Sequence, residues 1–389
     1  MKKITEKNRS IIVVHSIRHR NRLVSKKGCL KRQRRKNRKK NKKSNSPLSR
    51  FSTSTNNWIN HHKKILNINF LKRNVIEIIL PEKLNFSTNN KETTLYLTAI
   101  RILNRTETSA MQYKLGRVNF NYLEKISTSA ALVLTAELCR WDDSIRQNLR
   151  PEIEQWKPEV VLQFWQLGFF ELFHNNPTKD IDVEMYQDST INIVKYIKGK
   201  CGESKKIQSL KEGLVGLVGE NIKKWTFLAS GLTEAITNVG HHAYPDSASY
   251  RNRDKNWYMS GSYNKDTGEL KIVFFDQGIG VPHSLPASKF WEKILSGLSS
   301  SPMAEQKRDE VLLKAAVELN RTRTKDVDRG KGLPDFLTFI KQIGNGYISI
   351  ISQRGFYKYT EQDGKSNIKS IGFRYPLSGT LIIWSTKLV

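Results

Sequence analysis

Hydrophobic residues follow strand-like patterns where the folded part of the chain begins. VIEIILP and TLYLTAIRIL alternate or run apolar, and RVNFNYL is a further strand candidate. The period then changes in EKISTSAALVLTAELCRW, whose apolar positions suit a buried helix capped by Ser127 or Thr128. A second helix is predicted over residues 159–167, because a proline opens it and a glycine follows it. This order predicts a compact α/β module over residues 74–180.

A second set of patterns covers residues 181–389. GLVGLVGENIKKWTFLASGLTEAITNVGHHAY ends in a long helical pattern, and GELKIVFFDQGIG is an apolar strand that runs into a glycine turn. SPMAEQKRDEVLLKAAVELN predicts an amphipathic helix, and DRGKGLPDFLTFIKQIG predicts a glycine loop that leads into another. Three closing strands are expected in GYISIISQRG, KSIGFRYP and GTLIIWSTKL. We therefore expect an α+β fold, in which helices of the second domain pack on a mixed sheet.

Most of the positive charge precedes these patterns. The 389 residues include 66 Lys and Arg against 36 Asp and Glu, a formal net charge of +30. Residues 1–73 hold 24 of those basic residues and one acid, Glu6. The excess charge therefore describes this segment and not the fold, and we expect residues 1–73 to be a disordered basic arm and linker.

Other features of the composition narrow the class of protein. No apolar run approaches the roughly 18 residues that span a bilayer, which argues against a membrane partner. Cys29, Cys139 and Cys201 lack any paired spacing, as expected in a reducing compartment rather than in a disulfide framework or a zinc site. The apolar stretch at residues 11–14 is too short for a secretory signal. A soluble cytoplasmic protein is expected.

Candidate chemistry begins on the long helical pattern of the second domain. Glu234 and Asn238 are four residues apart, so both side chains point to one helix face. A carboxylate and a carboxamide in this arrangement can serve a hydrated magnesium ion and an attacking hydroxyl. A solvated polar stripe would have the same spacing.

Two glycine-containing turns follow. Asp276, Gly278 and Gly280 come directly after an apolar strand, which presents a carboxylate beside bare backbone and lets a flat ring approach. An ordinary turn is the alternative. Further along, glycine amides before a proline-initiated helix, together with basic side chains, form an anion site suited to phosphates. The residues of this loop are Arg329, Gly330, Lys331, Gly332 and Leu333.

Together with Gly379 and Thr380 at the head of the last strand, these motifs resemble the ATP-binding site of the GHKL superfamily, the group of gyrase, MutL and the histidine kinases. The resemblance covers residues 205–389. It implies that Asp276 binds the adenine amino group, that Asn238 holds Mg²⁺ and that Glu234 is the general base. It also implies that residues 330–333 cradle the phosphates, with Arg329 and Lys331 nearby, and that residues 282–329 form an ATP lid.

The N-terminal module carries a second resemblance. VNFNYLEKISTSAALVLTAEL is similar to the strand, turn and helix at the centre of STAS domains, the anti-anti-sigma-factor fold. In that family, a hydroxyl at the start of the helix accepts phosphate from a GHKL serine kinase, and Thr128, Ser127 or Ser129 would occupy its position. Here Ser127 replaces the usual acid and Ala130 the usual glycine, so these hydroxyls also fit simple helix caps.

These features favour an ATP- and Mg²⁺-dependent regulatory switch, either a weak ATPase or a serine/threonine protein kinase of the anti-sigma-factor type. Its expected partner is another regulatory protein or a second copy of the chain. A sensor histidine kinase is disfavoured because His61 and His62 lie in a linker without a helical hairpin. A gyrase- or MutL-like enzyme is disfavoured because Val389 follows Thr380 by only nine residues.

A nucleic-acid-binding protein is the alternative from another class. Lysines and arginines in residues 26–43 would contact RNA or DNA phosphates with little sequence preference, and the ATPase-like domain would be a scaffold or a nucleotide gate. A third interpretation makes the arm a transit or nuclear-import segment, or places the true start codon further downstream.

Overall fold

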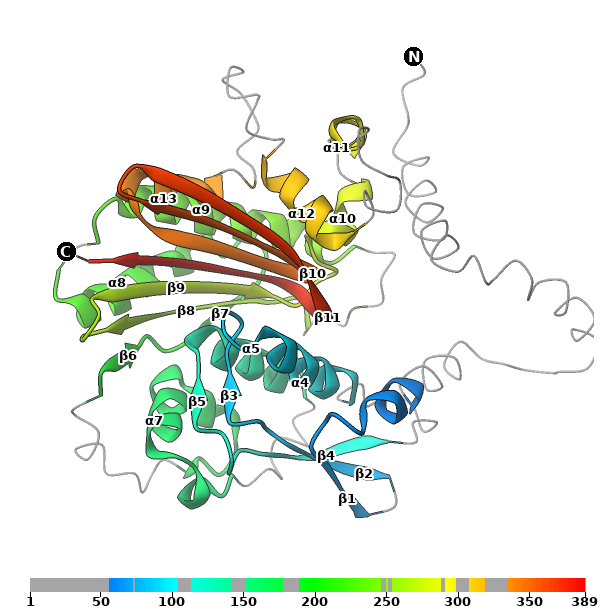
Figure 1. Cartoon of the computed structure of the whole chain (residues 1–389). Coiled ribbons are helices and arrows are strands. Elements are labelled where there is room, and N and C mark those ends of the chain that lie inside the picture. Colours follow the sequence, from blue (N-terminus) through cyan, green and yellow to red (C-terminus); the bar gives the residue numbers. More distant parts are fainter. Residues whose placement is uncertain are drawn as a thin grey trace, which may run out of the picture.

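The computed structural model describes two modules that pack against each other (Figure 1). Residues 1–55, most of the predicted basic arm, lie outside the described part of the chain. The described residues are 56–72, 74–103, 113–141, 151–177, 189–220, 222–245, 250, 254–287, 291–298, 308–318, 333 and 335–388.

The N-terminal module is a small α/β unit. Its central strand β2 pairs antiparallel with β1 and parallel with β4, while two short strands, β3 and β5, form a separate parallel pair. Its strands and helices are β1 (Ile68–Lys72), β2 (Val75–Ile79), β3 (Lys83–Leu84), α4 (Asn90–Leu103), β4 (Lys114–Asn119), β5 (Lys125–Ile126), α5 (Thr128–Cys139), η1 (Ile153–Gln155), α7 (Pro158–Leu167) and η2 (Phe169–Leu172).

The second module is built on a six-stranded sheet in the order β10-β11-β9-β8-β6, with β7 also paired to β8. Every pairing described in this sheet is antiparallel, whereas we expected mixed pairing here; the mixed pairing is found in the N-terminal module. Its elements are β6 (Ile191–Ile193), β7 (Ile197–Gly199), η5 (Ser204–Lys206), α8 (Ile207–Val218), α9 (Trp225–Asn238), η6 (Val239–Ala243), β8 (Trp257–Asn264), β9 (Glu269–Asp276), α10 (Val281–Ser284), η8 (Leu285–Ala287), α11 (Trp291–Gly297), α12 (Asp309–Glu318), α13 (Asp335–Ile343), β10 (Asn345–Gln362) and β11 (Lys365–Lys387).

Both faces of this sheet are covered. Helices α8, α9 and α13 pack on one face, and helices α4 and α5 of the N-terminal module pack on the other (Figure 1). The side chains of strand β9 alternate between the two faces. Ile272 and Phe274 pack in the core with α9 and α13, whereas Val273 and Phe275 pack in the core with α4 and α5. A strand buried on both faces is apolar throughout, which explains the continuous run that predicted it.

Helices α5 and α7 confirm the sequence predictions at their ends. Ser127 caps α5, because its hydroxyl accepts a hydrogen bond from the Ala130 amide at 3.3 Å. Gly168 ends α7 with a left-handed φ of 82°. Thr128 is buried between the modules and donates to the Ser262 hydroxyl of β8 at 2.9 Å. Of the three hydroxyls named as phosphoacceptor candidates, that of Thr128 is therefore enclosed in the interface, whereas Ser127 is only partly buried.

Helix α4 corrects one prediction, because TLYLTAIRIL was expected to be a strand. The helix lies between the two modules, so side chains on nearly all sides of it are buried and its helical period is hidden. The local signal for its start is polar: Asn89 donates to the Glu92 carboxylate at 2.7 Å just before the first turn.

Ordered structure also begins earlier than predicted. Residues 56–62 are helical, Ile59 and Leu66 are buried in the core, and β1 pairs with β2. The predicted arm and linker over 1–73 is therefore too long at its C-terminal end. The helix over residues 56–62 is only about two turns long, so it contains too few apolar residues to show a helical period in the sequence.

The structure has two long closing strands, β10 and β11, where three shorter ones were predicted. Strands β10 and β11 pair over most of their length, with register shifts on either side of Gln353, which has a φ of 53°. KSIGFRYP and GTLIIWSTKL both belong to β11. Irregularities of this kind bend a strand without ending it, so the break expected between the last two predicted strands is absent.

Because the sheet face under α4 and α5 is apolar, its largest side chains should contribute strongly to stability. We expect Phe275→Ala to lower the free energy of unfolding by about 3–5 kcal/mol, since Phe275 is fully buried between the modules. Guanidinium denaturation followed by circular dichroism measures this, with the half-exposed Phe70→Ala as the control. Equal costs for the two variants would contradict the packing of the modules.

Candidate functional site

Helix α9 carries the first two predicted site residues. Glu234 and Asn238 are half-buried, and the Asn238 Nδ2 donates to Glu234 Oε1 at 3.1 Å, so the shared helix face is confirmed. Asn238 is the last residue of the α-helix, and the chain continues as one wide π-helical turn, η6. Because Asn238 donates through its nitrogen, its carbonyl oxygen keeps the acceptor chemistry that Mg²⁺ requires.

Asp276 is the last residue of β9 and is paired on both sides, with Thr380 of β11 and Trp257 of β8. Its Oδ1 accepts a hydrogen bond from the Gly278 amide at 2.8 Å, and the Ile279 amide donates to the carbonyl of Ala243 at 2.8 Å. The second bond joins the turn after β9 to η6, which follows Asn238. Two motifs far apart in the sequence are thus brought side by side.

The glycine at 278 has a packing reason. A Cβ at this position would lie 2.4 Å from the carbonyl oxygen of Ala243, so a side chain there would push the turn away from η6. We predicted the glycine as room for a ligand ring, whereas in this structure it makes room for neighbouring backbone.

The carboxylate of Asp276 is strongly desolvated. Burial raises its pKa from 3.8 to about 6, although hydrogen bonds from Gly278 and Thr380 and the charge of Arg101 oppose the shift. Only 5% of the residue is exposed. A buried acceptor of this kind has most to gain from a ligand that donates a hydrogen bond.

Gly379 and Thr380 lie beside Asp276, because Thr380 of β11 is paired with Asp276 of β9. Gly379 has a φ of 103°, and a Cβ there would be 1.9 Å from the Asp276 carbonyl oxygen, so only glycine fits. Ser352 of β10 connects these segments through its hydroxyl. The hydroxyl donates to the Gly379 carbonyl at 2.9 Å, accepts from the Val281 amide at 2.8 Å and lies 3.1 Å from Thr380 Oγ1.

The predicted phosphate loop is only partly within the described chain. Arg329, Gly330, Lys331 and Gly332 lie outside it, so their predicted role stays a prediction. Leu333 is described and is partly buried between two hydrophobic clusters. Helix α13 begins two residues later and packs along α9, the helix that carries Asn238. The loop therefore ends next to the other site helix.

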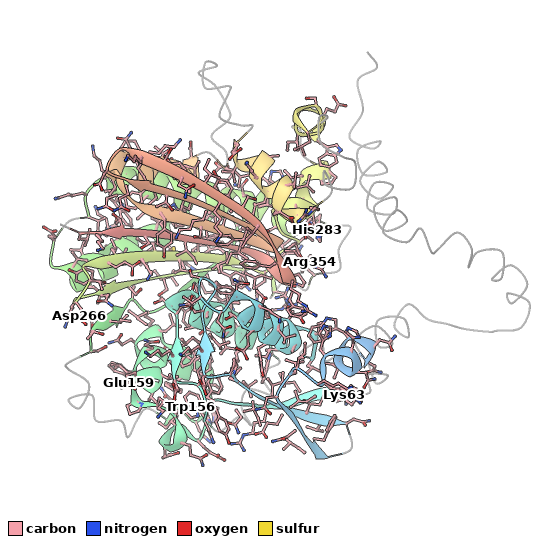
Figure 2. All side chains as sticks on the ribbon, in the orientation of Figure 1. Lys63, Trp156, Glu159, Asp266, His283 and Arg354 are labelled. Atoms are coloured by element: carbon pink, nitrogen blue, oxygen red, sulfur yellow. The ribbon has the colours of Figure 1, made fainter. Side chains whose placement is uncertain are left out.

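The predicted lid over residues 282–329 contains α11, α12 and most of α10. Helix α12 packs on β10 and buries Leu313 in the core that the sheet shares with α9 and α13. Asp309 at its start accepts from the Arg354 amide at 3.2 Å and lies 4.0 Å from His283 Nε2; Figure 2 shows these two partners close together at one end of the molecule. Residues of the lid that lie outside the described chain are 288–290, 299–307 and 319–329.

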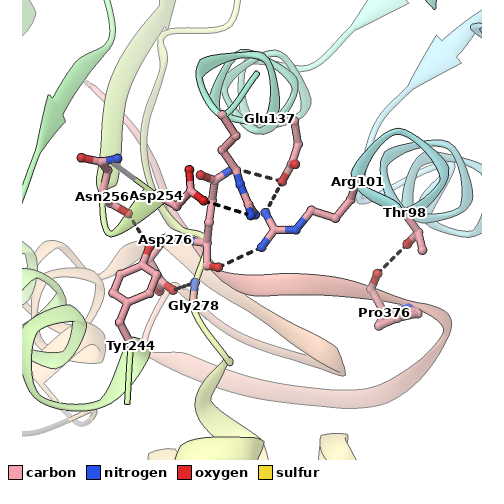
Figure 3. Close-up of polar contacts among 11 residues, drawn as sticks. Thr98, Arg101, Glu137, Tyr244, Asp254, Asn256, Asp276, Gly278 and Pro376 are labelled. Carbon is pink, nitrogen blue, oxygen red and sulfur yellow. Dashed lines mark hydrogen bonds and ion pairs between the residues drawn. The ribbon is translucent and has the colours of Figure 1, made fainter. Parts of the chain in front are cut away.

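The sequence analysis did not predict the residues that hold the turn after Asp276 in place through Gln277. Gln277 is fully buried and contacts Arg101 and Glu137 of the N-terminal module, while its amide donates to the Tyr244 hydroxyl at 3.1 Å (Figure 3). The available signal was weak: a lone arginine within TLYLTAIRIL and a lone glutamate within ALVLTAELC, both charges among apolar neighbours.

Comparison with protein-family models and with curated protein sequences finds no match for this chain. Among the helices that the structure describes, none is long and apolar enough to cross a bilayer. Among the same residues, no group of three or more His, Cys, Asp or Glu side chains is placed to hold a metal ion. The site is therefore interpreted from its geometry and its motifs.

The raised pKa of Asp276 should appear in the pH dependence of stability. The folded state binds this proton more tightly than the unfolded state, so stability falls as the pH rises from about 4 to about 6. Asp276→Asn imitates the protonated form, so at pH 7.5 we expect the variant to be more stable than the wild type by up to about 3 kcal/mol.

This gain should shrink below pH 6 and vanish near pH 4, as measured by urea denaturation across that range. Asp266→Asn, at an exposed position, controls for the loss of one charge. An advantage of Asp276→Asn that does not change with pH would contradict the desolvation of the carboxylate.

Proposed function

We propose that the chain is an ATP- and Mg²⁺-binding regulatory protein, acting as a weak ATPase or as a serine/threonine protein kinase switch of the anti-sigma-factor type. The observation that carries this proposal is the convergence of three motifs at one end of the sheet. Asp276 pairs with Thr380, and the turn after Asp276 is hydrogen-bonded to the segment that follows Asn238. Their order in the chain and the resemblance to the GHKL superfamily support the same site.

Each residue then has a distinct chemical task. The Asp276 carboxylate would accept a hydrogen bond from the exocyclic amine of adenine, with the desolvated site strengthening that bond. The Asn238 carbonyl oxygen would hold Mg²⁺, which neutralises phosphate charge when bound. Glu234, held four residues away on the same helix, would take a proton from water or from a protein hydroxyl.

The location of Thr128 bears on the kinase version of the proposal. Its hydroxyl is buried against Ser262 on the sheet face that α4 and α5 cover, opposite the face on which α9 and its Glu234 pack. A phosphoryl group could therefore reach Thr128 only if the modules separated. We propose that a substrate of a kinase activity would be a hydroxyl on a partner protein or on a second copy of the chain.

The nucleic-acid-binding alternative depends on residues 26–43, which lie outside the described part of the chain. No contact or surface in the described residues favours it over the nucleotide site.

Removing the adenine acceptor should abolish nucleotide binding. We expect Asp276→Asn to raise the dissociation constant for ATP·Mg²⁺ by about 100-fold or more. The variant loses the buried carboxylate that would accept the hydrogen bond from adenine, and the asparagine amide group would place its own N–H donors against the adenine amine. Isothermal titration calorimetry measures this, with Asp266→Asn as the matched control. An unchanged affinity would show that the site has been placed on the wrong residue.

Removing the general base should separate binding from turnover. We expect Glu234→Ala to bind ATP normally but to lose about 10²- to 10⁴-fold in rate, with Thr237→Ala, at an exposed position on the same helix, as the control. Incubation with γ-labelled ATP and candidate partner protein identifies the reaction. Label on a protein indicates a kinase, and free phosphate alone indicates an ATPase. Undiminished turnover in Glu234→Ala would remove this residue from the mechanism.

A further inference from the structure

A buried polar network joins the N-terminal module to the turn that carries Asp276 (Figure 3). Arg101 of α4 donates through Nη1 to Glu137 Oε1 of α5 at 2.6 Å, and through Nη2 to the carbonyl oxygen of Gln277 at 3.0 Å. Gln277 in turn donates through Nε2 to the same Glu137 oxygen at 3.0 Å. The three residues are 7%, 3% and 0% exposed, so water does not compete for these bonds.

On its other side, Gln277 is held by residues of the second module. Its amide donates to the Tyr244 hydroxyl at 3.1 Å, and that hydroxyl donates to the Asn256 carbonyl at 2.7 Å. Burial raises the pKa of Tyr244 far above 10, so the hydroxyl keeps the proton it donates. The backbone of Gln277 is therefore fixed at both its amide and its carbonyl, and the carbonyl is fixed only by the N-terminal module among the hydrogen bonds described.

The position of Gln277 determines the position of its neighbours. It is bonded covalently to Asp276, the predicted adenine acceptor, and to Gly278, whose amide orients that carboxylate. The turn has little freedom to adjust, because the Ile279 amide is hydrogen-bonded to the Ala243 carbonyl at 2.8 Å and a side chain at Gly278 would clash with that same carbonyl. A displacement of α4 or α5 would therefore shift the carboxylate or would break the hydrogen bonds of Arg101.

The network contributes little to the stability of the interface between the two modules. Arg101 Nε and Gln277 Oε1 are buried without a hydrogen-bond partner among the described residues, and an incompletely satisfied buried network stabilises a fold less than apolar packing does. The surrounding interface is already apolar. The contribution of the network is therefore geometric: a planar guanidinium that bridges two oxygens allows one alignment of the helices with the turn.

We infer that Arg101 and Glu137 are positioning residues for the nucleotide site, and that docking of the N-terminal module and occupation of the site are coupled. The inference rests on the proposed function. By linkage, nucleotide tightens the docking of α4 and α5, and a partner that draws these helices away lowers the affinity for nucleotide by the same factor. The N-terminal module thereby regulates the site without contacting the ligand.

Substitutions within the network test this coupling in the full-length protein. Arg101→Lys keeps the charge but replaces the two-pronged guanidinium by a single ammonium, and Glu137→Gln keeps the shape but removes the charge. We expect each to weaken ATP·Mg²⁺ binding about 10-fold or more by calorimetry, with unchanged stoichiometry. A variant that was merely unstable would lower the stoichiometry instead.

Thr98→Val is the matched control. Thr98 lies one turn before Arg101 on the same helix and in the same interface, but it donates to the Pro376 carbonyl of β11 at 2.8 Å and not to the Asp276 turn. Its loss should leave nucleotide affinity unchanged. Equal affinities for Arg101→Lys and Thr98→Val, with normal binding by the wild type, would overturn this inference alone. A wild-type protein that binds no ATP would overturn the proposed function as well.

Hydrogen exchange of the wild-type protein tests the coupling without any substitution. Saturating ATP·Mg²⁺ should slow exchange in α4 and α5 as well as in residues 276–280, while α7, which contributes no residue to the hydrogen bonds of the network, should change less. Protection confined to residues 276–280 would show that the site and the module are independent. This measurement decides the question even if the network variants fail to fold.

Discussion

Strand β9 is buried on both faces, and the arrangement of the whole molecule depends on that constraint. Alternate side chains of the strand pack on α9 and α13 on one side and on α4 and α5 on the other. Neither layer can be removed without exposing a row of large apolar side chains to water, at roughly 25 cal/mol for each Å² exposed. The two modules therefore stabilise each other through this strand, and the residue at the end of β9 lies at their common boundary.

Asp276 occupies that end, which explains the character of the site. The residue is paired in the middle of the sheet and is almost completely buried, so its carboxylate costs stability in the absence of a ligand. Buried carboxylates with raised pKa values are common where a protein uses the charge for binding or catalysis. The contacts from Gly278 and Thr380 offset part of the cost, and a hydrogen-bond donor from a bound molecule would offset more.

The sequence predicted those parts of the fold whose signals are local. Caps marked the start of α5 and the end of α7, an unbroken apolar run marked β9, and the spacing of Glu234 and Asn238 gave their shared helix face. Helix α4 was misread because both modules bury it. The contact between Arg101 and Gln277 could not be predicted, since it joins residues 176 positions apart through an interface that exists only in the folded chain.

Apolar packing and the polar network contribute differently to the interface. Apolar contacts between α4, α5 and the sheet supply most of the attraction, but they are non-directional and would tolerate small shifts of one layer over the other. The network tolerates no such shift, because the Arg101 guanidinium must reach oxygens of two modules at once. The ion pair of Arg140 with Asp254 crosses the same boundary at a longer distance of 3.6 Å. Affinity between the modules and alignment of the site are thus carried by different residues, so one can change while the other is retained.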